Sequence, residues 1–286
     1  MIDTAFLEQL KRFSLIIRKR VTSNYKGARR SIAFGRGLQI KDYRDYVVGD
    51  DIRLLDWKIF ARTNKLYVKQ YEEDRTLSVH IIIDRSSSMD FGKNTTKFEY
   101  GSMMGTGFAY LALKENDKFE FSTFSNDLDT LKPRRGVSQL MSIVDRLNKL
   151  EVKGNSKFEE SMQRYRGHLK GRCLVVVFSD FLFNLDEIKD GLMRLGKHEV
   201  KFVQVLDREE KDMKMYGDVK LFDSESHDVL RTFISRRLRQ KYTQKLNDHS
   251  SQIHDMCVKL GAGFYQITTD DPIFDSFYNV LTHGSL

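Results

Sequence analysis

From residue 78 onward, short apolar runs alternate with longer stretches of helical periodicity, and this pattern predicts strands that alternate with helices. The expected strands are 78–84, 118–125, 173–180, 200–207 and 263–268, with a short edge strand at 128–133. Runs such as "SVHIIID" and "CLVVVFSD" are apolar at nearly every position rather than at every second one. Such strands are buried on both faces, so we predict an α/β fold with a doubly wound, mainly parallel sheet and helices on both faces.

The expected helices are 97–114, 137–150, 157–169, 185–195, 235–260 and a last one from about Ile273, and a hairpin is expected within 219–233. Thr96 and Glu99 have the spacing of a capping box, which would begin the first of these helices. The glycine-rich run "GSMMGTG" lies inside that helix and lacks the lysine and hydroxyl pattern of a phosphate-binding loop. We therefore expect its glycines to let the helix pack closely on the sheet.

The first 76 residues follow a different pattern and predict a separate N-terminal extension. The run "FLEQLKRFSLIIRKR" predicts a helix with one apolar face, formed by Phe6, Leu10, Phe13 and Ile17. A polar stretch to about residue 38 follows, and then short strand-like pieces separated by turn signals. We predict two domains: a helical and short-strand extension over 1–76 and the α/β domain over 77–286.

The net charge of the chain originates in this extension. Residues 1–44 hold eleven lysines and arginines against three acids, which accounts for the whole net charge of +8. We favour the interpretation that the apolar face of the basic helix packs on the protein while its charges face water. The other interpretation is a docking surface for an acidic protein face, anionic lipid or nucleic acid.

No apolar run approaches the roughly 20 residues that cross a bilayer. The two cysteines, Cys173 and Cys257, have neither disulfide-framework nor metal-ligand spacing, and both are expected to be small buried hydrophobes. His80 is expected in the core, and His249 and His254 lack the spacing of a metal pair, so no zinc site is predicted. These features together predict a cytoplasmic protein.

Polar residues follow two of the apolar strands, and the packing of a hydrophobic core does not explain them. "DRSSS" supplies Asp84, Ser86 and Ser88 after one strand, "GNS" supplies Ser156 from a later loop, and "FSD" ends another strand at Asp180. Ligands of doubly wound sheets bind beyond the carboxyl ends of the strands, so we expect these side chains to meet there. Their oxygens suit Mg²⁺, or Mn²⁺, which takes hard oxygen ligands in an octahedron.

A bound cation would also remove an energetic problem. Two neighbouring buried carboxylates each cost several kcal/mol unless a cation or hydrogen bonds neutralise them. Five protein oxygens leave one octahedral position open, and an acidic side chain of another protein is able to fill it. The sequence thus predicts metal-dependent protein binding rather than catalysis.

The D-x-S-x-S pattern at Asp84, Ser86 and Ser88, on the first strand of a doubly wound fold, resembles the metal-ion-dependent adhesion site of von Willebrand factor A domains. In this likeness, Asp180 matches the aspartate that follows the fourth strand. Ser156 stands where such domains usually have threonine. The resemblance implies the same metal-dependent mode of protein binding.

Residues 35–75, from "GRGLQIKDYRDY" to "KQYEEDR", are similar to the signature of a bacterial family, domain of unknown function 58, and the region from "LFDSESHDVLRTF" to "ITTDDP" resembles it too. Members are commonly associated with MoxR-type AAA+ ATPases and are thought to act as adaptors or co-chaperones. The resemblance therefore implies such an ATPase, or its client, as the partner. Many members carry membrane helices ahead of this region; this sequence shows none, which leaves peripheral membrane association open.

The sequence leaves two other functions open. The first is a Mg²⁺-dependent hydrolase or phosphoryl-transfer enzyme with Asp84 as nucleophile. Against it, Ser86 replaces the second aspartate that phosphatases of the haloacid dehalogenase type have two residues on. The second is nucleic-acid binding by the basic N-terminal segment, which lacks a recognisable motif and interleaved aromatic residues. A serine-rich turn after a strand also has a simple structural interpretation, because it often only caps the next helix.

The run "YVVGDDIRLLDW" is either a partner-binding loop or a structural network, and we favour the network. In that network, three aspartates pair with three arginines while Trp57 packs. The six charged residues are Asp50, Asp51, Asp56, Arg44, Arg53 and Arg62.

Overall fold

The computed structural model describes residues 2, 4–21, 34–72, 77–171, 173–213, 215–222 and 229–282. The chain divides into two compact units, one formed by Arg20–Thr76 and the other by Met1–Lys19 together with Leu77–Leu286. In the described ranges no helix is both long and apolar enough to span a bilayer.

The larger unit is built on a six-stranded sheet in the order β10-β7-β6-β3-β4-β5. The strands are β3 (Ser78–Asp84), β4 (Lys118–Phe124), β5 (Leu128–Arg134), β6 (Cys173–Ser179), β7 (Glu199–Leu206) and β10 (Gly263–Thr268). All neighbours pair in parallel except β4 and β5, which pair antiparallel. The predicted α/β fold with a mainly parallel sheet is confirmed, and the strand order reverses between β3 and β6.

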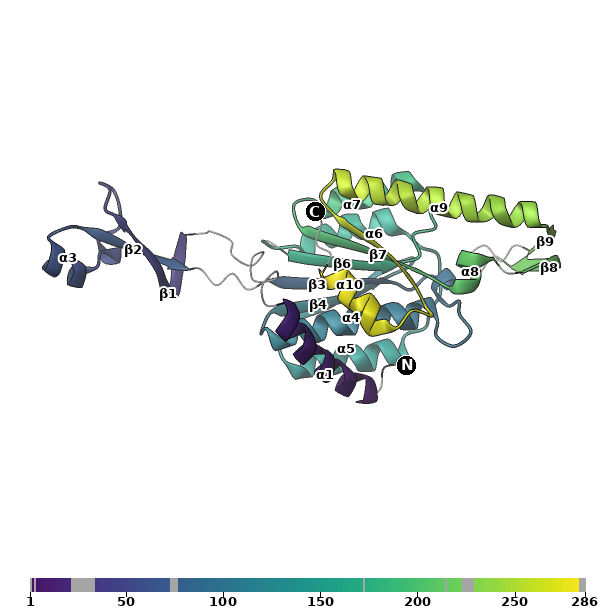
Figure 1. Cartoon of the computed structure of the whole chain (residues 1–286), viewed down its shortest axis with the longest axis horizontal. Coiled ribbons are helices and arrows are strands. Elements are labelled where there is room, and N and C mark those ends of the chain that lie inside the picture. The colour runs from purple at the N-terminus through teal and green to yellow at the C-terminus, as the bar shows by residue number, and fades with distance from the viewer. Residues whose placement is uncertain are drawn as a thin grey trace. The chain divides into compact units, whose positions relative to one another are not determined.

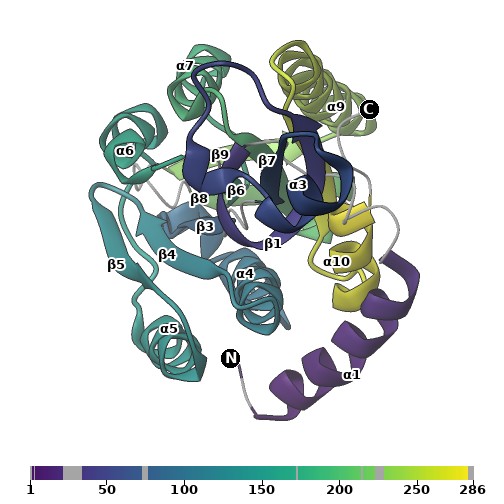
Figure 2. The same cartoon turned by 90° about the vertical axis from the view of Figure 1, so that its left-hand side faces the viewer.

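Helices cover both faces of this sheet (Figures 1 and 2). One face carries α4 (Lys97–Lys114), α5 (Val137–Lys149) and α10 (Ile273–Thr282), and the other carries α6 (Phe158–Tyr165), α7 (Leu185–Leu195) and α9 (Arg236–Lys259). Shorter elements are η2 (Ser87–Met89), η3 (Arg166–His168), α8 (Arg208–Asp212) and the hairpin of β8 (Gly217–Phe222) and β9 (Val229–Ile234). Because both faces are covered, β6 is buried along its whole length, as its continuous apolar run predicted.

Helix α4 begins at the predicted capping box. The Glu99 backbone N–H donates to Thr96 Oγ1 at 3.1 Å, and the Thr96 backbone N–H donates to Glu99 Oε2 at 3.1 Å. A Cβ added to Gly105 would lie only 2.9 Å from Cγ2 of Ile81 on β3. Glycine therefore lets α4 approach the sheet more closely than alanine would, which confirms the packing role at this position.

Helix α1 (Thr4–Val21) lies against α10 through its apolar face. Phe6 and Leu10 are buried, and the ring centroids of Phe13 and Phe274 are 4.8 Å apart. The favoured interpretation of this helix, an apolar face packed on the protein, is thus confirmed for these residues. The side chain of Ile17 lies outside the described residues.

The predicted domain over 1–76 is therefore wrong in its first part. Residues 1–19 group with the α/β unit, because aromatic packing joins α1 to α10. The predicted boundary at residue 77 agrees with the division of the structure.

The smaller unit pairs β1 (Phe34–Asp45) with β2 (Tyr67–Glu72) in antiparallel orientation, with η1 (Ile52–Leu54) and α3 (Trp57–Thr63) between them. The Arg44 guanidinium donates two hydrogen bonds of 2.6 Å to the carboxylate of Asp50. Asp56 caps α3 by accepting the backbone N–H groups of Lys58 and Ile59.

The network predicted for "YVVGDDIRLLDW" is thus right for the Arg44–Asp50 pair and wrong elsewhere. Asp51 accepts the backbone N–H of Arg53, and Asp56 lies 3.4 Å from Lys69 Nζ rather than against Arg62. Both aspartates precede a helical turn, where a carboxylate that accepts backbone N–H groups is more useful than an ion pair. Trp57 is 57% exposed and packs against Phe60 of its own helix.

Candidate metal-binding site

Asp84 is the last residue of β3, beside the point where the strand order reverses, and it is fully buried. Its Oδ1 accepts the backbone N–H of Ser86 at 2.9 Å. Its Oδ2 accepts the hydroxyls of Ser156 and Ser179 at 3.0 and 2.8 Å. Three segments that are distant in sequence therefore converge on this one carboxylate.

The two serines of the D-x-S-x-S pattern lie on the same side of their loop. Ser86 precedes the tight turn η2, and its Oγ lies 3.1 Å from Oγ of Ser88. Two ligands on adjacent corners of an octahedron with bonds of about 2.1 Å are about 3.0 Å apart. The observed spacing therefore suits a shared hard cation. Ser87 points elsewhere, since its Oγ accepts the backbone N–H of Gly154 at 3.0 Å and so joins two of the loops.

Asp180 follows the last residue of β6 and is also buried. Burial, and then repulsion by the Asp180 carboxylate, raise the pKa of Asp84 to about 7. The structure thus brings the five predicted residues together. Hydrogen bonds link Asp84 with Ser86 and Ser156 and link Ser86 with Ser88, while Asp180 is close enough for its charge to act on Asp84.

Lys97 belongs to this site, and the sequence analysis missed it. It is fully buried, and its Nζ lies 2.9 Å from Asp180 Oδ2 and 2.9 Å from Glu210 Oε1 of α8. Burial lowers the pKa of Lys97, but the two carboxylates outweigh this effect and raise it above the usual value. One feature of the sequence pointed to it. A lysine in the first turn of a helix opposes the helix dipole, which indicates a role other than helix stability.

The residue after Asp180 is held in a strained conformation. Phe181 has φ of +51°, in the left-handed region that L-residues other than asparagine and aspartate rarely adopt. Its buried ring stacks on Phe202 at a centroid distance of 4.8 Å, and its carbonyl oxygen accepts a hydrogen bond of 2.7 Å from His249 Nε2 on α9. The Gln204 side chain donates to the carbonyl oxygen of Asp180 at 2.8 Å. These contacts from α9 and β7 fix the loop that carries Asp180.

Within the described residues, no three histidine, cysteine, aspartate or glutamate side chains gather to hold a metal. The site at Asp84 has a different donor set, two carboxylates and several hydroxyls, which suits a hard cation and not zinc. His80 is buried, with its Nδ1 2.7 Å from Tyr165 Oη, and Cys173 and Cys257 are buried and free. These three residues therefore have the core positions that the sequence predicted.

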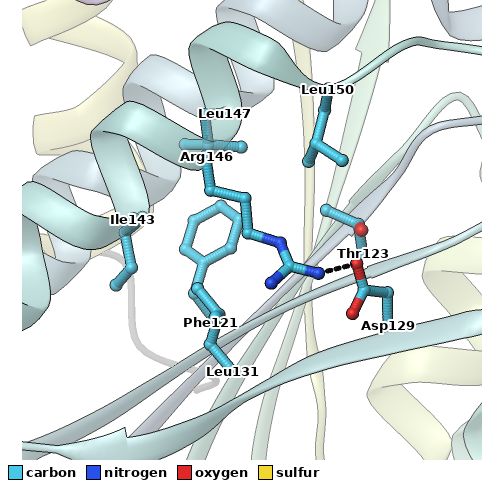
Figure 3. Close-up of a pocket in the computed structure, with 8 residues that line it drawn as sticks. All are labelled: Phe121, Thr123, Asp129, Leu131, Ile143, Arg146, Leu147 and Leu150. Carbon is cyan, nitrogen blue, oxygen red and sulfur yellow. Dashed lines mark hydrogen bonds and ion pairs between the residues drawn. The ribbon is translucent and has the colours of Figure 1, made fainter.

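A cavity between β4, β5 and α5 is too small for a ligand (Figure 3). Its volume is about 10 Å³, which is near the lower limit for one water molecule. Apolar side chains such as Phe121 and Leu131 line it, and the ion pair of Arg146 with Asp129 lies at its edge. It is a packing defect rather than a second candidate site.

Comparison with known proteins gives a family match over most of the chain. The model of the family described as "Protein of unknown function DUF58" matches residues 42–252. Curated relatives include "Uncharacterized protein Rv1480" of Mycobacterium tuberculosis and "Uncharacterized protein Mb1516" of Mycobacterium bovis. Each is 23% identical over 273 residues, which cover 94% of this chain and 86% of the relative.

Similar solved structures include two proteins from Bacteroides. An aerotolerance-related membrane protein from Bacteroides fragilis aligns with a TM-score of 0.44 and 14% identity, over 72% of this chain and 96% of that chain. The conserved hypothetical protein BatB from Bacteroides thetaiotaomicron aligns with a TM-score of 0.40 and 14% identity, over 72% of this chain and 100% of that chain.

Proposed function

Because the chain belongs to the family described as Protein of unknown function DUF58, whose description names no activity, we propose its function from the site at the carboxyl edge of the sheet. We infer that the protein is a non-enzymatic, metal-dependent protein-binding module. Mg²⁺, or Mn²⁺, would be held by Asp84, Ser86, Ser88, Ser156 and Asp180. The bound cation would supply a coordination position for an acidic side chain of the partner.

The state of Asp84 is the observation that carries this proposal. The carboxylate is fully buried and accepts three hydrogen bonds, and yet its pKa is raised to about 7. An ionised carboxylate in such a place destabilises the fold unless a cation neutralises it. The surrounding donors are all oxygens, which favours a hard divalent ion.

The charges explain why a partner's acid would need the metal. Three negative charges are present when Asp84, Asp180 and Glu210 are ionised, and Lys97 contributes one positive charge. The site without metal therefore has a net charge of about −2. A bare site of this charge repels a carboxylate. A divalent cation brings the net charge to about zero and offers the incoming oxygen a direct bond.

For the class of partner, we propose a MoxR-type AAA+ ATPase or one of its clients, in the cytoplasm. This part of the proposal rests on the sequence resemblance.

The proposal is tested by metal titration of the purified full chain. We expect one Mn²⁺ per chain by electron paramagnetic resonance, displaced by Mg²⁺, and we expect Asp84→Ala and the double variant Ser86→Ala with Ser88→Ala to lose it. The matched control is Ser138→Ala with Ser142→Ala, which removes two exposed hydroxyls from α5. Unchanged Mn²⁺ affinity in the Ser86 and Ser88 variant would show that this site is not the metal site.

One observation favours the alternative of phosphoryl transfer. The buried Lys97 ammonium lies next to the carboxylates, and a cation in such a place is able to stabilise a transferring phosphoryl group. Against it, three donors occupy the oxygens of Asp84, which weakens that carboxylate as a nucleophile. Hydrolysis of p-nitrophenyl phosphate that Asp84→Ala abolishes would establish this alternative.

A further inference from the structure

The N-terminal part of α9 extends past the carboxyl edge of the sheet (Figure 1). Its 24 residues span about 36 Å, whereas the seven residues of β6 span about 23 Å. The buried residues of α9 all lie toward its C-terminal end; they are Leu246, Ser250, Ile253 and Cys257. In the described structure, residues 236–245 therefore form an overhang that adds no side chain to the core.

The hairpin of β8 and β9 lies beside this overhang, because β9 leads directly into α9 (Figure 1). Three of its apolar side chains face solvent: Val229, Leu230 and Phe233 are 55%, 61% and 54% exposed. A two-stranded hairpin is at best marginally stable in water when nothing covers it. Val229 and Phe233 lie on the same face of β9, and exposed apolar residues that gather in this way are typical of a contact surface.

Residues 229–241, which we call the hairpin–helix surface, contain five cations and no acid. The cations are Arg231, Arg236, Arg237, Arg239 and Lys241. The first turn of α9 has no acidic residue, although the helix dipole favours acids and disfavours cations there. Helix stability therefore does not account for this charge, which suits a negatively charged partner.

Helix α8 joins the base of the hairpin to the candidate metal site. Glu209 pairs with Lys93, and Glu210 accepts Lys97 Nζ at 2.9 Å, the same ammonium that contacts Asp180. Helix α9 reaches the site as well, through the hydrogen bond of His249 to the carbonyl oxygen next to Asp180. A partner on the hairpin–helix surface would therefore lie at the same edge of the sheet as the metal site.

We propose that the hairpin–helix surface binds an acidic and partly apolar segment of a partner protein, and that the same partner supplies the carboxylate for the metal. This inference rests on the proposed function. The cations would attract the acids of the segment, while Val229 and Phe233, on one face of β9, would contact its apolar side chains. Nucleic acid fits less well, because the exposed apolar residues are mostly aliphatic and do not stack on bases.

The test measures fluorescence anisotropy of a labelled 20-residue peptide built from alternating pairs of glutamate and leucine, with the full-length protein in Mg²⁺ and in chelator. We expect Arg236→Glu with Arg237→Glu to weaken binding at least tenfold in both buffers. The matched control is Arg134→Glu with Arg135→Glu, which reverses two exposed charges at the end of β5 and should change affinity less than twofold. Should the first variant be poorly folded by circular dichroism, the neutral pair Arg236→Gln with Arg237→Gln should still weaken binding at least threefold.

Three results would overturn the inference: equal affinity in the two charge-reversed variants, equal binding of a peptide with glutamine in place of glutamate, or tighter binding of a 20-base-pair DNA that the same arginines control. The proposed metal function fails separately. If Mg²⁺ and chelator give the same affinity while the Arg236 and Arg237 variant still loses binding, the hairpin–helix surface is supported as the binding surface and the proposed role of the metal is refuted.

Discussion

Replacing Asp84 by asparagine keeps the shape of the side chain and removes its charge from the buried site. The folded protein without metal must otherwise hold an ionised Asp84 in a buried place next to Asp180. We therefore expect the Asp84→Asn variant to be more stable than the unchanged protein at alkaline pH in chelator. The opposite order is expected when metal is present.

The magnitude follows from the pKa of Asp84, which is 3.8 as a reference value and about 7 in the folded chain. A group whose pKa is raised on folding contributes stability that is fully present below the unfolded pKa and is lost as the pH rises through the folded pKa. This difference in pKa, about 3, corresponds to about 4 kcal/mol at pH 8. Asparagine has one acceptor oxygen where the carboxylate has two, so it is unable to accept all three hydrogen bonds, which costs about 1–3 kcal/mol. The expected net gain is therefore about 1–3 kcal/mol at pH 8 and close to zero at pH 5.

The assay is equilibrium unfolding in urea, followed by circular dichroism at pH 8 and pH 5, with chelator and with saturating Mg²⁺. The metal stabilises the unchanged protein because it binds only the folded state, and the variant should not respond. An Asp84→Asn variant that is less stable than the unchanged protein at pH 8 in chelator would refute the reasoning, since the buried charge would then not be destabilising.

Three further predictions concern other buried groups. Lys97→Met should cost about 3–5 kcal/mol without metal, because it leaves the buried Asp180 without its cation; urea unfolding should show recovery when Asp180→Asn is added, and no recovery would contradict the pairing. Gly105→Ala should lower thermal stability by about 1–3 kcal/mol, while Gly101→Ala, where an added Cβ meets its nearest neighbour at 3.4 Å rather than 2.9 Å, should cost clearly less. Burial lowers the pKa of His80 from 6.5 to about 4. As the pH falls from 6.5 to 4, the unfolded chain therefore binds a proton that the folded chain does not, and the free energy of unfolding falls by up to about 3 kcal/mol. The difference in the free energy of unfolding between the unchanged protein and His80→Gln should show this dependence on pH, and a difference that does not change with pH would exclude it.

Much of the fold was predictable because it depends on local patterns. Continuous apolar runs marked the buried strands, and Thr96 with Glu99 marked the start of α4. The positions of Asp84 and Asp180 at strand ends followed from the same pattern, since parallel strands bring their carboxyl ends to one edge. The assignment of α1 to the N-terminal domain was predicted wrongly, because it depends on which surface that helix meets.

The sequence by itself determined the strands and helices, the mainly parallel sheet and the polar residues at its carboxyl edge, because hydrophobic periodicity and capping act between near neighbours. Only the tertiary structure decided that Lys97 reaches Asp180, 83 residues away, and that Ser179 joins the hydrogen bonds of Asp84. It also decided that α1 packs on α10 and that α9 continues past the sheet beside the candidate site. Such contacts form between surfaces that are brought together by the whole fold, and no local periodicity specifies them.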